Sequence, residues 1–97
     1  MTQPEFQWDV AKAELNRKKH GVDFRDAATA FRDDHALVLF DPDHSAEEDR
    51  FILLGMSASS RLLVVCHCYR ESDQIIRLIS ARKALAPERR QYLRRKP

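Results

Sequence analysis

The hydrophobic pattern of this chain changes its period near residue 36, and this change restricts the folds open to it. Residues Phe24, Ala27, Ala28 and Phe31 recur at the spacing of a helix with one buried side. Beyond residue 36, aliphatic and β-branched residues dominate four stretches that are typical of strands: 36–40, 50–56, 62–69 and 74–81. Helices followed by a run of strands predict an α+β fold in which the helices cover one face of a sheet.

Capping residues indicate where the first two helices begin and end. Asp9 is a good N-cap for a helix over 10–20, which Gly21 ends by taking the left-handed conformation. Asp23 begins a second helix almost at once, and Asp33 closes it. The sequence therefore predicts two N-terminal helices before the sheet.

The polar gaps at 57–61 and 70–73 have the length of hairpin turns, which predicts an antiparallel four-stranded meander. The apolar-polar-apolar stretch 6–8 offers a short extra edge strand at the N-terminus. Pro87 suits the first turn of a short C-terminal helix that continues over 88–95. A chain of 97 residues has room for one domain, 1–97, with one core.

Several classes of protein are disfavoured by composition. Hydrophobic residues make up 43% and charged residues 33%, as in soluble globular proteins, and no apolar run is long enough to span a bilayer. The first five residues lack the features of a signal peptide, so we expect a cytoplasmic protein without a membrane partner. With only two glycines, the chain has no glycine-rich phosphate loop, and we expect no nucleotide cofactor.

The two cysteines, Cys66 and Cys68, are two residues apart in a predicted strand and would point to one face, opposite His67. A disulfide across that spacing would be badly strained, and the known tetrahedral zinc sites need more ligands at other spacings. We therefore expect reduced structural thiols and no metal.

Charge is strongly segregated along the chain although the net charge is only +2. Residues 23–50 hold nine acids and three bases, whereas residues 70–97 hold nine bases and three acids. A basic C-terminal third suits a phosphate-rich partner. The alternative is a solvated surface whose two halves attract each other.

Several residues carry two interpretations each. His67 is either a hydrogen-bonded core residue or a functional one. Arg77 interrupts an apolar strand and either pairs with an acid such as Glu48 or Asp49 or faces a ligand, because an unpaired buried charge is costly. The pair Lys19-His20 is equally consistent with a helix cap.

Arginines, lysines and histidines thus gather around an antiparallel sheet that has neither a metal cage nor a cofactor loop. RNA cleavage needs little machinery: a base for the ribose 2′-OH, an acid for the departing 5′-oxygen and cations for the charged phosphorane. A histidine, a carboxylate and two or three arginines would suffice.

Three groups of residues in order along the chain resemble the BrnT family. The first group is Phe6-x-Trp8-Asp9, Lys12-x-x-x-Asn16-x-x-Lys19-His20-Gly21-Val22-x-Phe24 and Ala27-x-x-x-Phe31-x-Asp33. The second is Asp43-His44-Ser45-x-x-Glu48-x-Arg50-Phe51-x-x-x-Gly55, and the third is Arg77-x-Ile79-Ser80-Ala81-Arg82-Lys83-Ala84 followed by Glu88-Arg89-x-x-Tyr92. Two positions depart from the pattern, since Asp49 stands where glutamate is frequent and Ser60 replaces a frequent turn glycine.

The resemblance implies a RelE-like ribonuclease fold and a toxin that arrests translation by cleaving RNA. It also implies a partner antitoxin of the BrnA type with a ribbon–helix–helix DNA-binding domain, in a hetero-oligomer that reaches operator DNA through the antitoxin.

We therefore expect a metal-independent endoribonuclease of the mRNA interferase type, in which the ribose 2′-OH is the nucleophile. The expected catalytic residues are Lys19, His20, Glu48, Arg50, His67, Arg77 and Arg82. The expected RNA-binding residues are Arg70, Lys83, Arg89 and Tyr92, although Tyr92 also suits packing of the last helix. The alternative is a non-catalytic RNA-binding or corepressor subunit that acts through its antitoxin.

Overall fold

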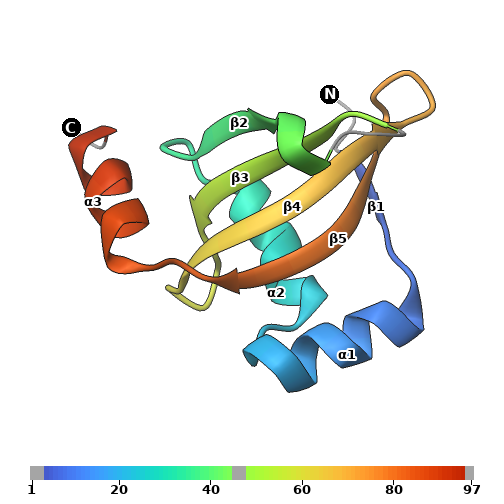
Figure 1. Ribbon diagram of the computed structural model, residues 1–97, viewed down its shortest axis with the longest axis horizontal. Helices are drawn as coiled ribbons and strands as arrows, with labels where there is room; N and C mark the ends of the chain where they lie inside the picture. Colours follow the sequence, from blue (N-terminus) through green and yellow to red (C-terminus); the bar gives the residue numbers. More distant parts are fainter. Residues whose placement is uncertain (1–3, 45–47, 96–97) are drawn as a thin grey trace.

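The computed structural model describes residues 4–44 and 48–95, so Ser45 and the first three residues lie outside the described part. The elements in chain order are β1 (Glu5–Gln7), α1 (Val10–His20), α2 (Phe24–Thr29), the 3₁₀ helix η1 (Ala30–Arg32), β2 (Leu37–Asp41), the 3₁₀ helix η2 (Pro42–His44), β3 (Arg50–Met56), β4 (Leu62–Arg70), β5 (Ile75–Lys83) and α3 (Ala86–Arg95). The α+β class and the order of helices and strands are as predicted (Figure 1).

The extra N-terminal edge strand that the sequence offered is present as β1, but the sheet differs from the predicted four-stranded antiparallel meander. It contains five strands in the order β1-β5-β4-β3-β2. The three pairs among β2, β3, β4 and β5 are antiparallel, but β1 runs parallel to β5, with Glu5 opposite Ile75. The prediction of an antiparallel four-stranded sheet is therefore wrong, and the sheet is mixed. A parallel neighbour requires a long connection, which here runs from residue 8 to residue 74.

The predicted caps of the first helices are confirmed. The Asp9 side chain accepts a hydrogen bond from the backbone N–H of Lys12 at 3.1 Å, and Gly21 ends α1 with φ 70°. The Asp23 side chain accepts from the N–H of Arg25 at 2.8 Å at the start of α2. The second helix is shorter than predicted, because its last turn tightens into η1 after Thr29.

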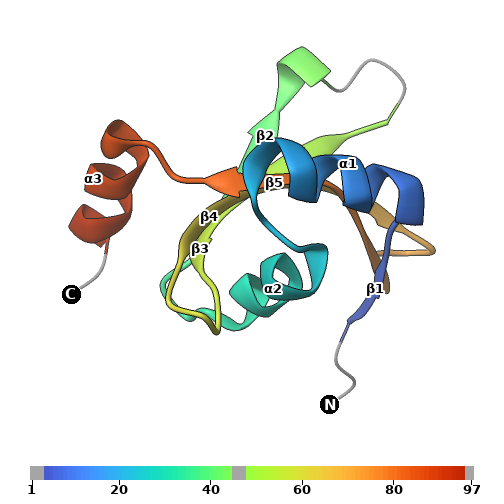
Figure 2. The same ribbon diagram turned by 90° about the horizontal axis from the view of Figure 1, so that it is seen from below.

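Helix α2 covers one face of the sheet, which we call the helix face (Figure 2). Its core combines residues from α2 and η1 with alternate residues of the strands: Val22, Phe24, Ala27, Ala30, Leu53, Leu63, Val65, Ile76, Leu78 and Ala81. Fully burying a side chain such as Phe24 or Leu63 contributes about 1.5–3 kcal/mol. We call the opposite face the open face, and Figure 1 views the sheet from that side with α2 behind the strands.

Helix α3 covers only one end of the open face. Tyr92 packs there against Leu54, Leu62 and Val64, and its hydroxyl donates a hydrogen bond to Asp33 at 2.6 Å. Burial and then this hydrogen bond raise the pKa of Tyr92 to about 12. Among the described residues, no other α-helix covers the rest of the open face (Figure 1).

Asn16 joins α1 to the edge of β5 beyond the point where β1 ends. Its side-chain amide donates to the carbonyl of Ala81 at 2.9 Å and accepts from the Ala81 N–H at 3.0 Å. The side chain therefore replaces a neighbouring strand for this residue, and it aligns α1 with β5.

Ser60 lies in the hairpin turn after β3, where the resemblance suggested a frequent glycine. It has φ 64°, a left-handed conformation that glycine takes without strain.

Within residues 4–44 and 48–95, no helix is long and apolar enough to cross a membrane.

Candidate nucleic-acid interface

Arginines from three neighbouring strands point to the open face. Arg50 begins β3, Arg70 ends β4, and β5 carries both Arg77 and Arg82. Side chains alternate between the two faces of a strand, so residues five apart such as Arg77 and Arg82 should face opposite ways.

A β-bulge removes this conflict. Arg77 pairs with Cys68 and Arg82 pairs with Val64, which are four residues apart on β4 and share a face. The register shifts between Cys66 and His67, which leaves Ile79 as the extra residue on β5. The bulge therefore brings both arginines to the same side of the sheet.

One cavity on this face is strongly basic. Its volume is about 160 Å³, and its lining includes four cations and two carboxylates: Asp9, Lys12, Glu48, Arg50, Arg70, Arg77, Leu78 and Ile79. We call it the basic pocket. Four positive side chains around one small cavity are suited to a phosphate group, because each can donate charged hydrogen bonds.

Lys12 is the cation of this pocket that sequence reasoning missed. It lies in the first turns of α1, one helical turn before Asn16, and Asn16 anchors that side of α1 to β5. Residues four apart in a helix share a side, so the spacing of Lys12 and Asn16 contained a signal for this position.

The second cavity adjoins the first through Arg50 and Ile79, which line both. Its volume is about 260 Å³, and its lining is Asp41, Arg50, Ile52, Val64, Cys66, Ile79, Ser80 and Arg82. We call it the apolar pocket. An apolar floor between two arginines suits a flat group that is polar at its edge.

Arg82 is held at the rim of the apolar pocket by α3. Its guanidinium forms two hydrogen bonds to the Glu88 carboxylate, at 2.8 and 2.7 Å. The hydrogen bonds that Arg82 donates to Glu88 raise the pKa of Arg82 and lower the pKa of Glu88. Arg82 thus pairs with an acid of α3, Glu88.

Arg70 and Arg77 have weaker partners than Arg82. Arg77 donates to the side-chain oxygen of Gln7 at 2.9 Å, which is neither of the acids considered from sequence. Arg70 contacts Glu48 at 3.3 Å. Both contacts involve partly exposed side chains, so each leaves donors that can turn to a ligand.

His67 lies on the other side of the sheet from the arginines. It is fully buried, its Nδ1 lies 3.0 Å from the Val65 carbonyl, and its Nε2 lies 3.3 Å from the Tyr69 hydroxyl. The ring packs edge-on against Phe31 with centroids 4.8 Å apart. Burial lowers the pKa of His67, so the ring is neutral near pH 7. The core interpretation of His67 fits this position.

The remaining predicted residues are spread over the ends of α1, β5 and α3. Lys19 and His20 form the last turn of α1, which runs alongside β5 (Figure 1). Lys83 and Arg89 are exposed, whereas Tyr92 is buried in the packing of α3. Stacking of Tyr92 on a base would require α3 to unpack.

Both cysteines point to the open face, as the two-residue spacing predicts. Cys66 lines the apolar pocket, and Cys68 lies beneath the Glu48–Arg70 pair. Burial raises the pKa of each thiol, so neither is a reactive thiolate at pH 7. Among the described residues, no group of three His, Cys, Asp or Glu side chains is placed to hold a metal ion.

Comparisons with known proteins agree with the resemblance. The family model described as the ribonuclease toxin BrnT of type II toxin–antitoxin systems matches residues 8–88. The crystal structure of the Brucella abortus ribonuclease toxin BrnT superposes with a TM-score of 0.64 at 24% identity, covering 86% of this chain and 99% of that one. No curated protein matches in sequence.

Proposed function

Since this chain belongs to the BrnT family of ribonuclease toxins of type II toxin–antitoxin systems, we propose that its open face binds RNA and cleaves it. The basic pocket is the observation that carries this proposal, because it combines Lys12, Arg50, Arg70 and Arg77 with two carboxylates above the strands. Asp9 caps α1 with its carboxylate, which leaves Glu48 as the proton acceptor. A backbone phosphate bound there would have cations around it and a proton acceptor beside it.

In the proposed reaction, the ribose 2′-oxygen attacks the neighbouring phosphorus. Glu48 takes the proton of the 2′-OH as the new P–O2′ bond forms. The P–O5′ bond breaks, and the 5′-oxygen takes a proton from Lys12, the lysine that lines the pocket. The products are a 2′,3′-cyclic phosphate and a 5′-hydroxyl, and the arginines stabilise the extra negative charge of the phosphorane.

This assignment moves the proton transfer from His67 to Glu48. His67 is separated from the basic pocket by the sheet itself, because it is buried against Phe31 on the helix face. Glu48 lines the pocket and lies 3.3 Å from Arg70, which keeps its carboxylate directed over the cations.

We propose that the apolar pocket binds the nucleotide next to the one whose phosphate lies in the basic pocket. Arg82 contributes charge at its rim, in an orientation that Glu88 fixes. Lys83 and Arg89 extend the basic surface toward α3, and Lys19 and His20 extend it along α1. We propose these outer residues as phosphate contacts for the flanking strand.

The family assignment supports an antitoxin partner. We further propose that the substrate is mRNA, that its cleavage stops translation, and that a ribbon–helix–helix antitoxin neutralises the toxin and carries the complex to operator DNA. Expression without the antitoxin should therefore arrest growth, and normal growth of cells with abundant soluble toxin would contradict this.

The test is a turnover assay in excess EDTA. Toxin at one-tenth of the RNA concentration should consume all of the RNA and leave 2′,3′-cyclic or 3′-phosphate ends, while Glu48→Gln should bind RNA but cleave it at least tenfold more slowly. Binding without turnover would favour the non-catalytic RNA-binding subunit. Activity that EDTA abolishes and magnesium restores would favour a metal-dependent nuclease.

A further inference from the structure

A third cavity lies on the helix face at the start of β3, and its chemistry is opposite to that of the basic pocket. Its volume is about 440 Å³, within the range of about 300–1,000 Å³ that is typical of ligand sites. Its lining residues are Glu48, Asp49, Phe51, Tyr69 and Asp73. We call it the acidic groove.

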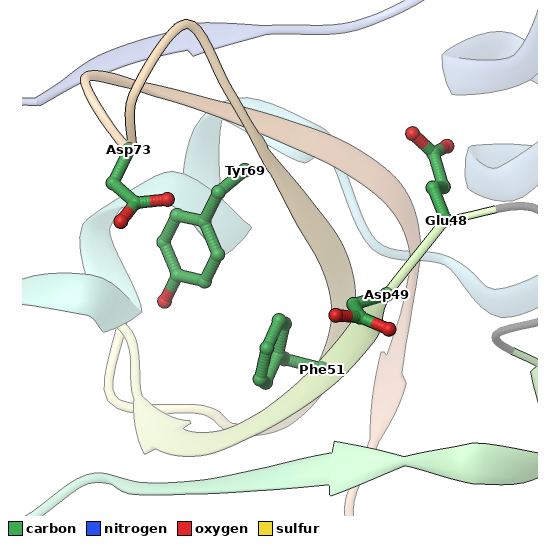
Figure 3. Close-up of a pocket in the computed structure, with 5 residues that line it drawn as sticks. All are labelled: Glu48, Asp49, Phe51, Tyr69 and Asp73. Carbon is green, nitrogen blue, oxygen red and sulfur yellow. The ribbon is translucent and has the colours of Figure 1, made fainter.

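The acidic groove combines two aromatic rings with carboxylates. Figure 3 shows Phe51 and Tyr69 facing each other, with the carboxylates of Asp49 and Asp73 on either side. The two ring centroids are 5.3 Å apart in an edge-to-face arrangement. In the described part of the chain, the lining contains three acids and no base, so it repels a phosphate backbone and attracts a cation. Aromatic faces next to carboxylates are well suited to a guanidinium or ammonium group.

An exposed apolar edge adjoins the acidic groove. Phe40 of β2 is 51% exposed and packs against Phe51 with ring centroids 5.6 Å apart. Val38, on the same face of β2, is 48% exposed. β2 is the last strand of the sheet, so its outer backbone edge has no strand partner among the described residues. Exposed apolar side chains on an unpaired edge are typical of protein-binding surfaces.

We propose that the acidic groove and the adjoining edge of β2 dock the antitoxin. The docking segment presents an arginine or lysine to the groove and apolar side chains to Val38 and Phe40. Charge complementarity selects this occupant over RNA, which the carboxylates repel. The inference rests on the proposed function only in taking the antitoxin as the partner.

The position of Glu48 explains how docking would neutralise the toxin. Glu48 lines both the acidic groove and the basic pocket. A segment seated in the groove therefore lies at the rim of the basic pocket and obstructs RNA there. Antitoxin and RNA then compete for the toxin.

The experiment uses the toxin and the antitoxin encoded in its own operon. The test variant is Asp49→Lys combined with Asp73→Asn, since Asp73 has φ 69° and asparagine tolerates this conformation. The control variant, Asp34→Lys with Glu14→Gln, makes the same charge change at exposed sites outside the groove. Calorimetric titration should show antitoxin affinity at least tenfold weaker for the test variant, about 1.4 kcal/mol, and within threefold of wild type for the control.

Cleavage of RNA by the test variant should stay within threefold of wild type, so that cells expressing it remain arrested when the antitoxin is present. If the test variant binds the antitoxin as tightly as wild type does, while both cleave RNA, only the docking proposal is overturned. If wild type does not cleave RNA, the proposed function is overturned. A change of more than tenfold in cleavage would assign the groove to RNA. Dimerisation of wild type that the test variant loses, in sedimentation of the isolated toxin, would assign it to a second copy. Either result would overturn the proposal.

Discussion

The two faces of the same sheet differ in what their polar side chains do, and strand β4 shows this within five residues. His67 faces α2 and is enclosed by aromatic rings, with both ring nitrogens next to polar atoms of β4. Cys66, Cys68 and Arg70 point the other way and form part of the basic and apolar pockets or lie beneath them. Whether a side chain can act on a ligand therefore depends on the face that it occupies as much as on its residue type.

The largest expected effect is on the open face. Arg77→Ala and Arg50→Ala should each lower the single-turnover cleavage rate about 10²–10³-fold, because each removes a donor to the developing charge. Lysine at either position should restore only part of the rate, since it cannot reproduce the bidentate fork. Arg17→Ala, an exposed arginine of α1 paired with Glu14, is the matched control. Full activity of Arg77→Ala would place the reaction elsewhere.

On the helix face the effect should be on folding. His67→Ala removes a fully buried ring and should lower the free energy of unfolding by about 2–4 kcal/mol, measured by urea denaturation. His67→Phe keeps the volume and should fold. Its cleavage rate should stay within threefold of wild type, and a 100-fold loss in this folded variant would return His67 to the catalytic machinery.

The same buried histidine predicts a pH dependence of stability. Burial lowers the pKa of His67 in the folded state, so below the unfolded value of about 6.5 the unfolded chain binds a proton that the folded chain does not. The contribution of His67 to the free energy of unfolding is therefore complete above about pH 6.5 and falls as the pH decreases. Its slope cannot exceed about 1.4 kcal/mol per pH unit, the value for one proton. Between pH 6.5 and 5, wild type should lose more stability than His67→Phe. Parallel curves for the two proteins would show that another group is responsible.

A smaller effect is expected where α3 meets the open face. Glu88→Gln should weaken the hold on Arg82 and lower the free energy of unfolding by only about 0.5–1 kcal/mol, since both side chains are partly exposed. Cleavage should fall a few-fold through a less ordered Arg82. An unaltered cleavage rate together with the expected loss of stability would show that Arg82 serves only to fasten α3.

Local signals predicted most of the elements. The caps at Asp9 and Gly21 set the bounds of α1. The aliphatic composition of residues 50–56 predicted β3 with the bounds that the structure has. The parallel pairing of β1 could not be predicted, because a three-residue strand has little pattern and its partner Ile75 lies about seventy residues away. Pairings of that kind depend on the finished core rather than on neighbouring residues.

The candidate site depends on features that a strand pattern does not contain. Strict alternation would separate Arg77 from Arg82, and only the bulge at Ile79 puts them on one face. Sequence placed His67 opposite the two cysteines, which is confirmed, but it did not say which face the helices cover. Lys12 was missed because its role depends on how Asn16 orients α1 along β5.

The most direct test of the open face as the RNA surface is the salt dependence of affinity for a non-cleavable 2′-O-methyl RNA. If about four phosphates are bound, log K against log salt should have a slope near −3, from roughly −0.7 per contact on a single strand. Arg77→Gln should reduce this slope to about −2, while Arg17→Gln should leave it near −3. A flat response in wild type, or the same slope in wild type and Arg77→Gln, would contradict the assignment of RNA binding to this face.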